Sequence, residues 1–325
     1  MDALRHFQHA QAFRLLAQDL AGTMTVERLA DHLSALADVV LEATLATVWA
    51  HLCGPDAAPP RFAIVGYGKL GGKELGYASD LDLVFLFDAA DGDEDDTAPE
   101  RYARLARRLV TWLNSTTAAG QLYDTDLRLR PDGAAGLMVS SVAAFRKYQR
   151  TQAWPWEHQA LTRARFVTGH PAVGVAFEAE REAILRLPRE RAQLAADVVD
   201  MRRKMAAGHP NPTDRFDLKH DPGGMVDVEF AVQFLVLAHS AAHPRLTRNL
   251  GNIALLRIAG ELGLVPGAIA SDAADAYRDF RRLQHQIRLT DAPHARVDPT
   301  SQQARRDAVA ALWQAVFGAP WQAVA

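Results

Sequence analysis

Apolar residues recur at helical spacing through the first fifty positions of the chain. Spacings of three and four residues predict two amphipathic helices across residues 3–52. The apolar positions are Leu4, Phe7, Leu15 and Leu16 in the first helix, and Leu29, Leu33, Leu36, Val40 and Leu41 in the second. A glycine and several prolines follow within residues 54–60, so we expect a linker and a domain boundary near residue 58.

Two short apolar runs, residues 62–65 and 81–87, come after this linker and bracket a Gly-rich turn. Runs of this length between turn residues predict β-strands. Residues 101–113 have a helical pattern, and residues 122–129 alternate like a strand before Pro131. The middle of the chain is therefore expected to combine helices with a mixed sheet.

Helical patterns dominate from Pro155 onward. Proline suits the first turn of a helix, which we expect to run through Ala164. Residues 227–239 are apolar enough for a buried helix. The fold class is thus α+β, in three segments: an N-terminal helical segment (1–58), a domain with the sheet (59–170) and a C-terminal helical bundle (171–325).

Composition narrows the class of protein. The chain has 325 residues, 49% of them apolar and 23% charged, as is usual for a soluble globular protein of two or three domains. The net charge of -3 provides no cationic field, so no nucleic-acid partner is expected. The N-terminus lacks a signal-peptide pattern, and no apolar run approaches the roughly 20 residues that span a bilayer. We expect a cytoplasmic protein without a membrane partner.

Cys53 is the only cysteine, which excludes an intrachain disulfide and fits a reducing compartment. We expect it to be a buried or incidental thiol. An acidic stretch lies between Asp88 and Glu100, but an EF-hand centred on Gly92 would place Phe87 at its first ligand position. A solvated loop is expected there instead of a calcium site.

The Gly-rich turn, Gly66 to Gly72, matches the dinucleotide-binding pattern G-x-G-x-x-G, and Asp88 lies near the usual position of the ribose-binding acid. That fold requires a parallel crossover of about a dozen residues or more, usually a helix. Only Leu70 to Ala78 lie between the two predicted strands. We therefore expect antiparallel strands, and a dinucleotide-dependent oxidoreductase is the least favoured interpretation.

Antiparallel pairing brings the start of the second strand beside the end of the first, so the Gly turn and the following aspartates meet at one edge. Asp80 and Asp82 then point to one face of the strand, while Leu81 and Leu83 point to the other. Two carboxylates so close repel each other unless a cation lies between them, and Mg²⁺ prefers oxygen ligands together with substrate phosphates. The pattern favours metal-dependent phosphoryl or nucleotidyl transfer.

The alternating segment 123–130 supplies further polar groups. As a strand, it places Asp124, Asp126, Arg128 and Arg130 on one face. A third carboxylate there can complete a metal site or accept the proton of an attacking hydroxyl, and the arginines can hold a triphosphate. Singly, such residues are as often ordinary solvent-facing groups; together with the Gly turn they favour an active site.

With these residues assembled, the sequence resembles the glutamine synthetase adenylyltransferase family of the polymerase-β-like nucleotidyltransferase superfamily over nearly the whole chain. Proteins of this family contain two transferase domains, of which one adds AMP to glutamine synthetase and the other removes it. The present motifs resemble the C-terminal, adenylylating copy. These motifs are Gly66–Leu75, Ser79–Asp82, Asp126–Pro131, Trp154–Leu161 and Gly223–Phe230.

The resemblance implies a role for each matching residue. Asp80, Asp82 and Asp126 would be the catalytic carboxylates and ligands of Mg²⁺, and ATP would transfer AMP to a tyrosine hydroxyl of glutamine synthetase with release of pyrophosphate. The PII signalling protein is an implied regulatory partner. Lys69 stands where the superfamily often has serine and can contact a phosphate. The implied nucleotide-binding residues are Gly68, Lys69, Gly71, Gly72, Ser79, Arg128 and Arg130.

Two other functions remain open for this fold. One is phosphorolytic removal of AMP from the same tyrosine, and the other is a non-catalytic regulatory domain, against which the three intact aspartates argue. Asp227 and Glu229 are offset by two and cannot share a helix face, so at most one is expected to face a site. An acid near a helix N-terminus is an equally good explanation. Trp154, Trp156 and His158 are expected to pack in a core.

Overall fold

The computed structural model describes residues 1–88, 98–290 and 292–319. The chain divides into two compact units. Unit 1 comprises Met1–Ala153 and Arg163–Ile184, and unit 2 comprises Trp154–Thr162 and Leu185–Ala325. The second N-terminal helix shares a core with the sheet of unit 1. The segments expected from sequence, with boundaries near residues 58 and 170, stay a prediction.

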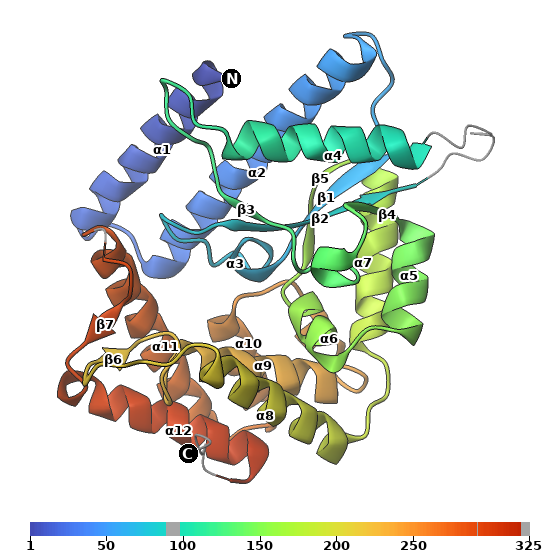
Figure 1. Cartoon of the computed structure of the whole chain (residues 1–325). Helices are drawn as coiled ribbons and strands as arrows, with labels where there is room; N and C mark the ends of the chain where they lie inside the picture. Colours follow the sequence, from blue (N-terminus) through green and yellow to red (C-terminus); the bar gives the residue numbers. More distant parts are fainter. Residues whose placement is uncertain (89–97, 291, 320–325) are drawn as a thin grey trace. The chain divides into compact units, whose positions relative to one another are not determined.

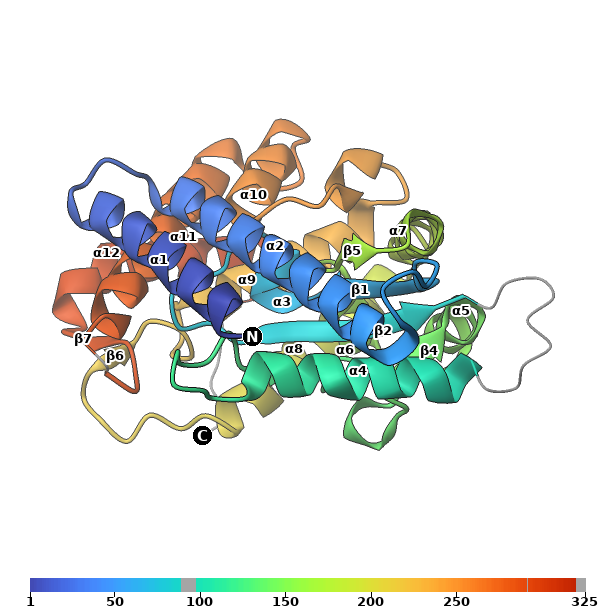
Figure 2. The same cartoon turned by 90° about the horizontal axis from the view of Figure 1, so that it is seen from above.

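Unit 1 begins with the two predicted helices, α1 (Asp2–Leu20) and α2 (Val26–Cys53), which lie side by side (Figure 2). Thr25 caps α2 by accepting a hydrogen bond from the backbone N–H of Arg28 at 3.3 Å. Gly54 ends α2 and opens the expected linker. Cys53, in the last turn of α2, is an exposed free thiol.

The sheet of unit 1 is mixed and has the order β3-β2-β1-β5 (Figure 1). β1 (Phe62–Gly66) and β2 (Leu81–Phe87) are antiparallel, which confirms the prediction and removes the dinucleotide-binding interpretation. β3 (Thr125–Asp126) and β4 (Val139–Ser141) both pair with β2 in parallel. β5 (Arg165–Gly169) is antiparallel to β1.

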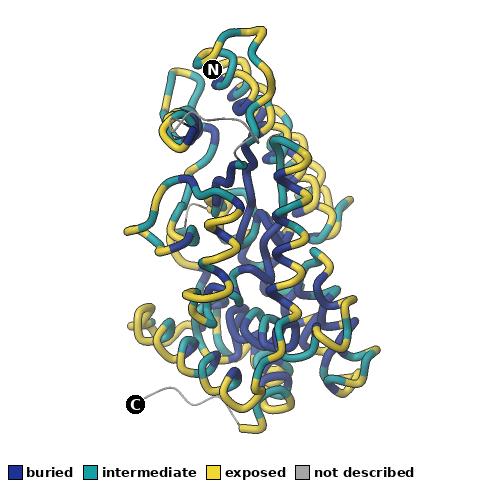
Figure 3. The backbone as a smooth tube through the Cα atoms, turned by 90° about the vertical axis from the view of Figure 1, so that its right-hand side faces the viewer, coloured by how far each residue is buried: buried dark blue, intermediate teal, exposed yellow. Residues whose placement is uncertain are grey.

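One face of β1 and β2 packs against α2 and α4 (Ala98–Asn114), the helix predicted over residues 101–113. The buried side chains include Phe62, Ile64, Leu81, Leu83 and Phe85 from the strands, with Leu33, Val40, Leu105 and Leu109 from the helices. Such burial contributes about 25 cal/mol per Å² of apolar surface and dominates the stability of the unit. Figure 3 colours buried residues dark blue along the backbone tube.

Contrary to expectation, α2 is long and apolar enough to cross a membrane by length and composition; it is the one helix of this kind in the described ranges. Half of its apolar window is buried inside the protein. Leu29, Ala37 and Leu41 on this helix are completely inaccessible to solvent within the core of unit 1. Its hydrophobic character therefore has a structural explanation as a core helix.

The remaining elements of unit 1 are the short helix α3 (Gly68–Gly71), the 3-10 turn η1 (Gly133–Ala135), α5 (Val142–Thr151) and α7 (Pro171–Leu185). Phe145 of α5 and Phe177 of α7 are in contact, with ring centroids 5.8 Å apart. Asp88 follows β2 and pairs with Arg61 at 2.6 Å. The loop predicted between Asp88 and Glu100 falls largely in residues 89–97, outside the described residues.

Unit 2 is a helical bundle, as predicted. Its short helix α6 (Pro155–Leu161) begins with the expected proline, and its apolar helix α9 (Met225–His239) is largely buried. A two-stranded ribbon joins β6 (Phe216–Asp217) to β7 (Arg296–Val297). Its other elements are α8 (Arg191–Ala207), η2 (Pro244–Thr247), α10 (Asn252–Glu261), α11 (Gly267–Arg288), η3 (Thr300–Gln302) and α12 (Gln303–Phe317).

Candidate active site

The Gly turn lies directly against the second aspartate of β2. Gly68 has a φ of 53°, and a Cβ atom there would lie 2.1 Å from Asp82 Oδ2, so only glycine fits. The backbone N–H of Tyr67 donates to the Asp82 carbonyl at 2.9 Å. The turn and the aspartates therefore meet at one edge of the sheet, as the antiparallel pairing predicts.

Strand pairing brings Asp126 beside Asp82, and Asp80 directly precedes β2. Asp82 on β2 is in register with Asp126 on β3, while Leu81 and Leu83 are buried on the opposite face. Burial and the charges of Asp80 and Asp126 raise the pKa of the Asp82 carboxyl to about 6. These charge effects are in keeping with neighbouring carboxylates, and the role of the three acids as one site stays a prediction.

The strand predicted over residues 122–129 is much shorter in the structure. Only Thr125 and Asp126 form a strand, and the chain then bends, so Asp124, Asp126, Arg128 and Arg130 do not share one strand face. Arg130 stabilises this bend, since its Nη1 donates to the Leu127 carbonyl at 2.7 Å. The same guanidinium also donates to the carbonyls of Ala134 and Gly136, which fixes the turn after β3.

Arg128 bonds to Asp126. Its Nε lies 2.8 Å from Asp126 Oδ2 and 3.0 Å from Oδ1, its Nη2 also contacts Oδ2, and its backbone N–H donates to Oδ1 at 2.8 Å. The side-chain hydrogen bond from Arg128 is the main reason that the pKa of Asp126 is lowered. The Arg128 side chain is 79% exposed, so its charge is accessible to an anionic ligand.

The other expected nucleotide-binding residues surround the turn. The charges of Arg163 and Lys69 lower the pKa of Asp82 and partly oppose the effects of burial and the other acids, so Lys69 lies within electrostatic range of the carboxylates. Gly71 packs closely, since a Cβ there would lie 2.0 Å from the Arg163 carbonyl oxygen. Ser79 Oγ accepts from the Gly76 N–H at 3.1 Å and shapes the loop before Asp80.

The donor chemistry of this cluster suits Mg²⁺, which favours carboxylate oxygens. Within the described ranges, however, no three acidic, histidine or cysteine side chains already stand close enough to enclose an ion. Asp126 is instead bonded to Arg128. Asp80, Asp82 and Asp126 fit a cation by chemistry, with Asp126 needing to exchange its arginine partner.

The raised pKa of Asp82 predicts that the carboxylate cluster destabilises the metal-free protein. Its folded pKa of about 6 exceeds the ordinary value of 3.8, so the folded state binds the proton more tightly and loses stability as pH rises between these values. The full shift corresponds to roughly 3 kcal/mol. We expect Asp82→Asn to unfold at a higher temperature than the native chain at pH 8 in a chelator, with the difference shrinking toward pH 4.

Thermal unfolding followed by circular dichroism measures this effect. Asp126→Asn is the matched control, for which the opposite change in unfolding temperature is expected. The pKa of Asp126 is lowered, and its replacement removes hydrogen bonds from Arg128. This control should therefore unfold at a lower temperature than the native chain at pH 8. Equal or lower stability of Asp82→Asn at pH 8 contradicts the prediction.

Two buried arginines beside the turn, Arg163 and Arg165, are absent from the residues expected from sequence. Both residues are 7% exposed, and each donates to a carbonyl of the turn. Their signal in the sequence is the pair of cations in Arg163-Ala-Arg165 at the start of an otherwise unremarked strand. A charge inside a sheet is expensive unless it is paired.

In unit 2, Asp227 and Glu229 have separate structural partners. Asp227 pairs with Arg202 at 2.6 Å and accepts from the Gly223 N–H at 2.7 Å. Glu229 accepts from the hydroxyl of Tyr277 at 3.0 Å. They do not act together, as their offset of two predicts. The expectation that Trp154 packs in a core is wrong, because this residue is 66% exposed.

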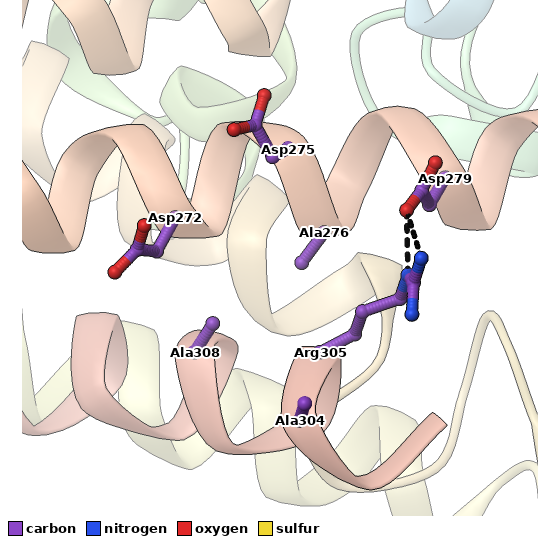
Figure 4. Close-up of a pocket in the computed structure, with 7 residues that line it drawn as sticks. All are labelled: Asp272, Asp275, Ala276, Asp279, Ala304, Arg305 and Ala308. Atoms are coloured by element: carbon purple, nitrogen blue, oxygen red, sulfur yellow. Dashed lines mark hydrogen bonds and ion pairs between the residues drawn. The ribbon is translucent and has the colours of Figure 1, made fainter. Parts of the chain in front are cut away.

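A cavity of about 410 Å³ in unit 2 lies between α11 and α12 (Figure 4). Asp272, Asp275 and Asp279 line it together with Arg305. Asp279 is paired with Arg305, and Asp275 with Arg278, so much of this acidic charge is already compensated. No residue of the Gly turn or of the three-aspartate cluster lines it.

The antiparallel strand pair, its Gly turn and the three aspartates at its edge define a polymerase-β-like nucleotidyltransferase core. The model of the glutamate-ammonia ligase adenylyltransferase family matches residues 1–180. The chain belongs to this family. Residues 192–323 also match the model of the GlnD PII-uridylyltransferase family, so the second match begins after the sheet and covers helices of unit 2.

Curated relatives are similar along almost the entire chain. A bifunctional glutamine synthetase adenylyltransferase/adenylyl-removing enzyme of Aromatoleum aromaticum is 58% identical over 321 residues, covering 98% of this chain and 33% of the relative. Enzymes of the same name from Ralstonia nicotianae and Burkholderia mallei are 58% and 54% identical over 98% of this chain, which covers 33% and 35% of their lengths. The chain thus spans about a third of these relatives.

Proposed function

We propose that this chain transfers AMP from ATP to a tyrosine hydroxyl of glutamine synthetase and releases pyrophosphate. The observation that carries the proposal is the register of Asp82 with Asp126 beside a turn in which Gly68 touches Asp82. The family and the names of the relatives supply the nucleotide and the acceptor protein. A cytoplasmic location accompanies this proposal.

The residues of the site have distinct roles in this reaction. Asp80, Asp82 and Asp126 would hold Mg²⁺, which supplies charge stabilisation for the developing pyrophosphate. Lys69 and Arg128 attract the triphosphate, and Arg128 exchanges its carboxylate partner for a phosphate. Arg130 acts indirectly by holding the turn that carries Arg128. Gly68, Gly71, Gly72 and Ser79 form the backbone surface beside which the phosphates lie.

The tyrosine oxygen attacks the α-phosphorus of ATP, and the bond from that phosphorus to the bridging oxygen of the β-phosphate breaks. The hydroxyl proton leaves the tyrosine as the new ester bond forms, and we assign a carboxylate of the cluster as its acceptor; Asp126, in register with Asp82, is the candidate. Pyrophosphate is released, and AMP remains on the tyrosine.

Incubation with glutamine synthetase, Mg²⁺ and ATP labelled at the α-phosphate tests the proposal. Label is expected on a tyrosine of glutamine synthetase, and none is expected when a chelator replaces the metal. Failure of the native chain to transfer label under metal-replete conditions removes the proposal. If the aspartates only support the fold and the site is inactive, no label is transferred either with Mg²⁺ or with the chelator.

The opposite reaction is the second candidate, because the relatives are named as adenylyl-removing enzymes as well. In it, phosphate attacks the same phosphorus, tyrosine leaves with a proton, and ADP is formed. Adenylylated glutamine synthetase, incubated with phosphate and the chain, distinguishes this activity by release of ADP. Regulation through the PII protein is a further proposal, consistent with the second family match over residues 192–323.

A further inference from the structure

Arg163 and Arg165 approach the Gly turn from its buried side. Arg165 belongs to β5, where it is in register with Gly66 at the end of β1, and Arg163 lies two residues earlier. Both side chains are nearly inaccessible, with 8% and 9% exposure. Their positions exclude an ordinary surface role and place two permanent cations beneath the turn.

Each guanidinium donates its Nε–H to a backbone carbonyl of the turn. Arg163 bonds to the Gly68 carbonyl at 3.1 Å, and Arg165 bonds to the Leu70 carbonyl at 3.2 Å. The turn is therefore fixed at two points, two residues apart along α3. Hydrogen bonds from charged donors are stronger than neutral ones and restrict orientation more tightly.

The same two side chains are anchored by carboxylates. Arg163 Nη2 lies 2.6 Å from Glu74 Oε2, and Arg165 Nη2 lies 2.7 Å from Asp38 Oδ1. Glu74 is itself 4% exposed at the far end of the turn, whereas Asp38 belongs to α2. Both charges are thus compensated, and the turn is tied to β5 and to the helix that forms the core.

Close packing transmits this anchoring to the acidic cluster. A Cβ atom on Gly72 would lie 3.0 Å from Arg163 Nε, and one on Gly68 would lie 2.1 Å from Asp82 Oδ2. The turn is therefore enclosed between the arginines on one side and a carboxylate of the cluster on the other. Displacing the turn by a fraction of an ångström must alter its distance from Asp82.

We propose that Arg163 and Arg165 are positioning residues, which set the backbone of the Gly turn relative to Asp82 and to the phosphates of the nucleotide. This inference rests on the proposed function for its catalytic consequence. The two arginines do not touch the reacting atoms; they act through the carbonyls of Gly68 and Leu70. Misplacement of a reacting group by about 1 Å lowers rates on the order of 10²-fold.

The lysine variants Arg163→Lys and Arg165→Lys test the proposal. Lysine retains the charge but lacks the planar fork that reaches a carbonyl and a carboxylate together. We expect kcat at saturating ATP to fall on the order of 10²-fold, because the displaced turn persists with ATP bound. Amide hydrogen exchange across residues 66–75 should accelerate by about tenfold as the turn opens locally.

Glu180→Gln is the matched control. Glu180 is a buried carboxylate of unit 1 that also pairs with arginines, Arg146 at 3.0 Å and Arg150 at 2.5 Å, but it makes no bond to the turn. This control should lower the unfolding temperature while leaving both kcat and exchange across residues 66–75 at native values. A purely structural role for the arginines predicts that all three variants behave alike.

Unchanged kcat in both lysine variants, with an active native chain, overturns the positioning role. Loss of kcat in the Glu180→Gln control to the same extent also overturns it. When the native chain itself transfers no label, the proposed function has failed, and the exchange measurement decides separately whether the arginines hold the turn: faster exchange in the lysine variants supports that they do, and native exchange overturns it.

Discussion

Asp82→Asn is expected to lower the proposed AMP transfer to glutamine synthetase on the order of 10³-fold, the size of effect seen when a charge-stabilising group is removed from an active site. Asn keeps the shape of the side chain but removes the charge that draws a cation and orients the phosphates. Asp82 is the carboxylate in contact range of the Gly turn and in register with Asp126, so its loss affects both. Transfer of α-phosphate label measures the change.

Asp88→Asn is a matched control for this experiment. Asp88 follows the same strand, β2, and pairs with Arg61 at a half-exposed position away from the turn, so its removal should change the rate by less than about twofold. Because the metal-free Asp82→Asn protein is expected to be more stable than the native chain, its loss of activity is not attributable to unfolding. Native activity in Asp82→Asn contradicts the assignment of the site.

Asp227→Ala is expected to destabilise unit 2 by about 3–5 kcal/mol, because it leaves the buried guanidinium of Arg202 without its carboxylate. The two side chains are 0% and 2% exposed and lie 2.6 Å apart. The substitution also removes the acceptor for the Gly223 N–H, which begins the turn into α9. Denaturant unfolding measures the change in the free energy of unfolding.

The double variant Arg202→Met with Asp227→Leu separates the buried charge from the geometry, since replacing both charges is often nearly neutral. It should recover much of the stability lost in Asp227→Ala. Lys204→Ala, which removes a pair with Asp200 on the surface of the same unit, should change stability by less than about 1 kcal/mol. A similarly small effect of Asp227→Ala shows that the buried pair is not essential to the unit.

Local patterns in the sequence predict β1, β2 and the helices because each depends on neighbouring residues. The antiparallel pairing also follows from sequence, since the segment from Leu70 to Ala78 is too short for a parallel crossover. This argument brings Asp80 and Asp82 to the Gly turn. The segment 123–130 adds Asp126 as a candidate third carboxylate, which the family resemblance singles out, and Asp126 is in register with Asp82.

Specific side-chain contacts, some local and some between distant residues, explain what the sequence does not predict. Alternation over residues 122–129 is typical of a strand, but Arg130 bonds to the carbonyls around it and stabilises a bend in the chain. The charges of Arg163 and Arg165 disguise the start of β5 in the sequence, because a buried strand is expected to be apolar. The carboxylate that compensates Arg165 is Asp38, which lies 127 residues away in the chain. Likewise, the structural role of Asp227 comes from its ion pair with Arg202. This pair exists only when α8 and α9 are packed together, so the sequence does not reveal it.

From the short connection between β1 and β2 we expect a particular order of assembly for the acidic edge during folding. Loops of this length close at a small entropic cost, so this strand pair and its Gly turn form from local contacts. The pairing of β3 with β2 joins more distant segments and is the step that sets Asp126 against Asp82. Repulsion between these carboxylates therefore opposes a late, long-range step of folding rather than the nucleus, and it should speed unfolding more than it slows folding.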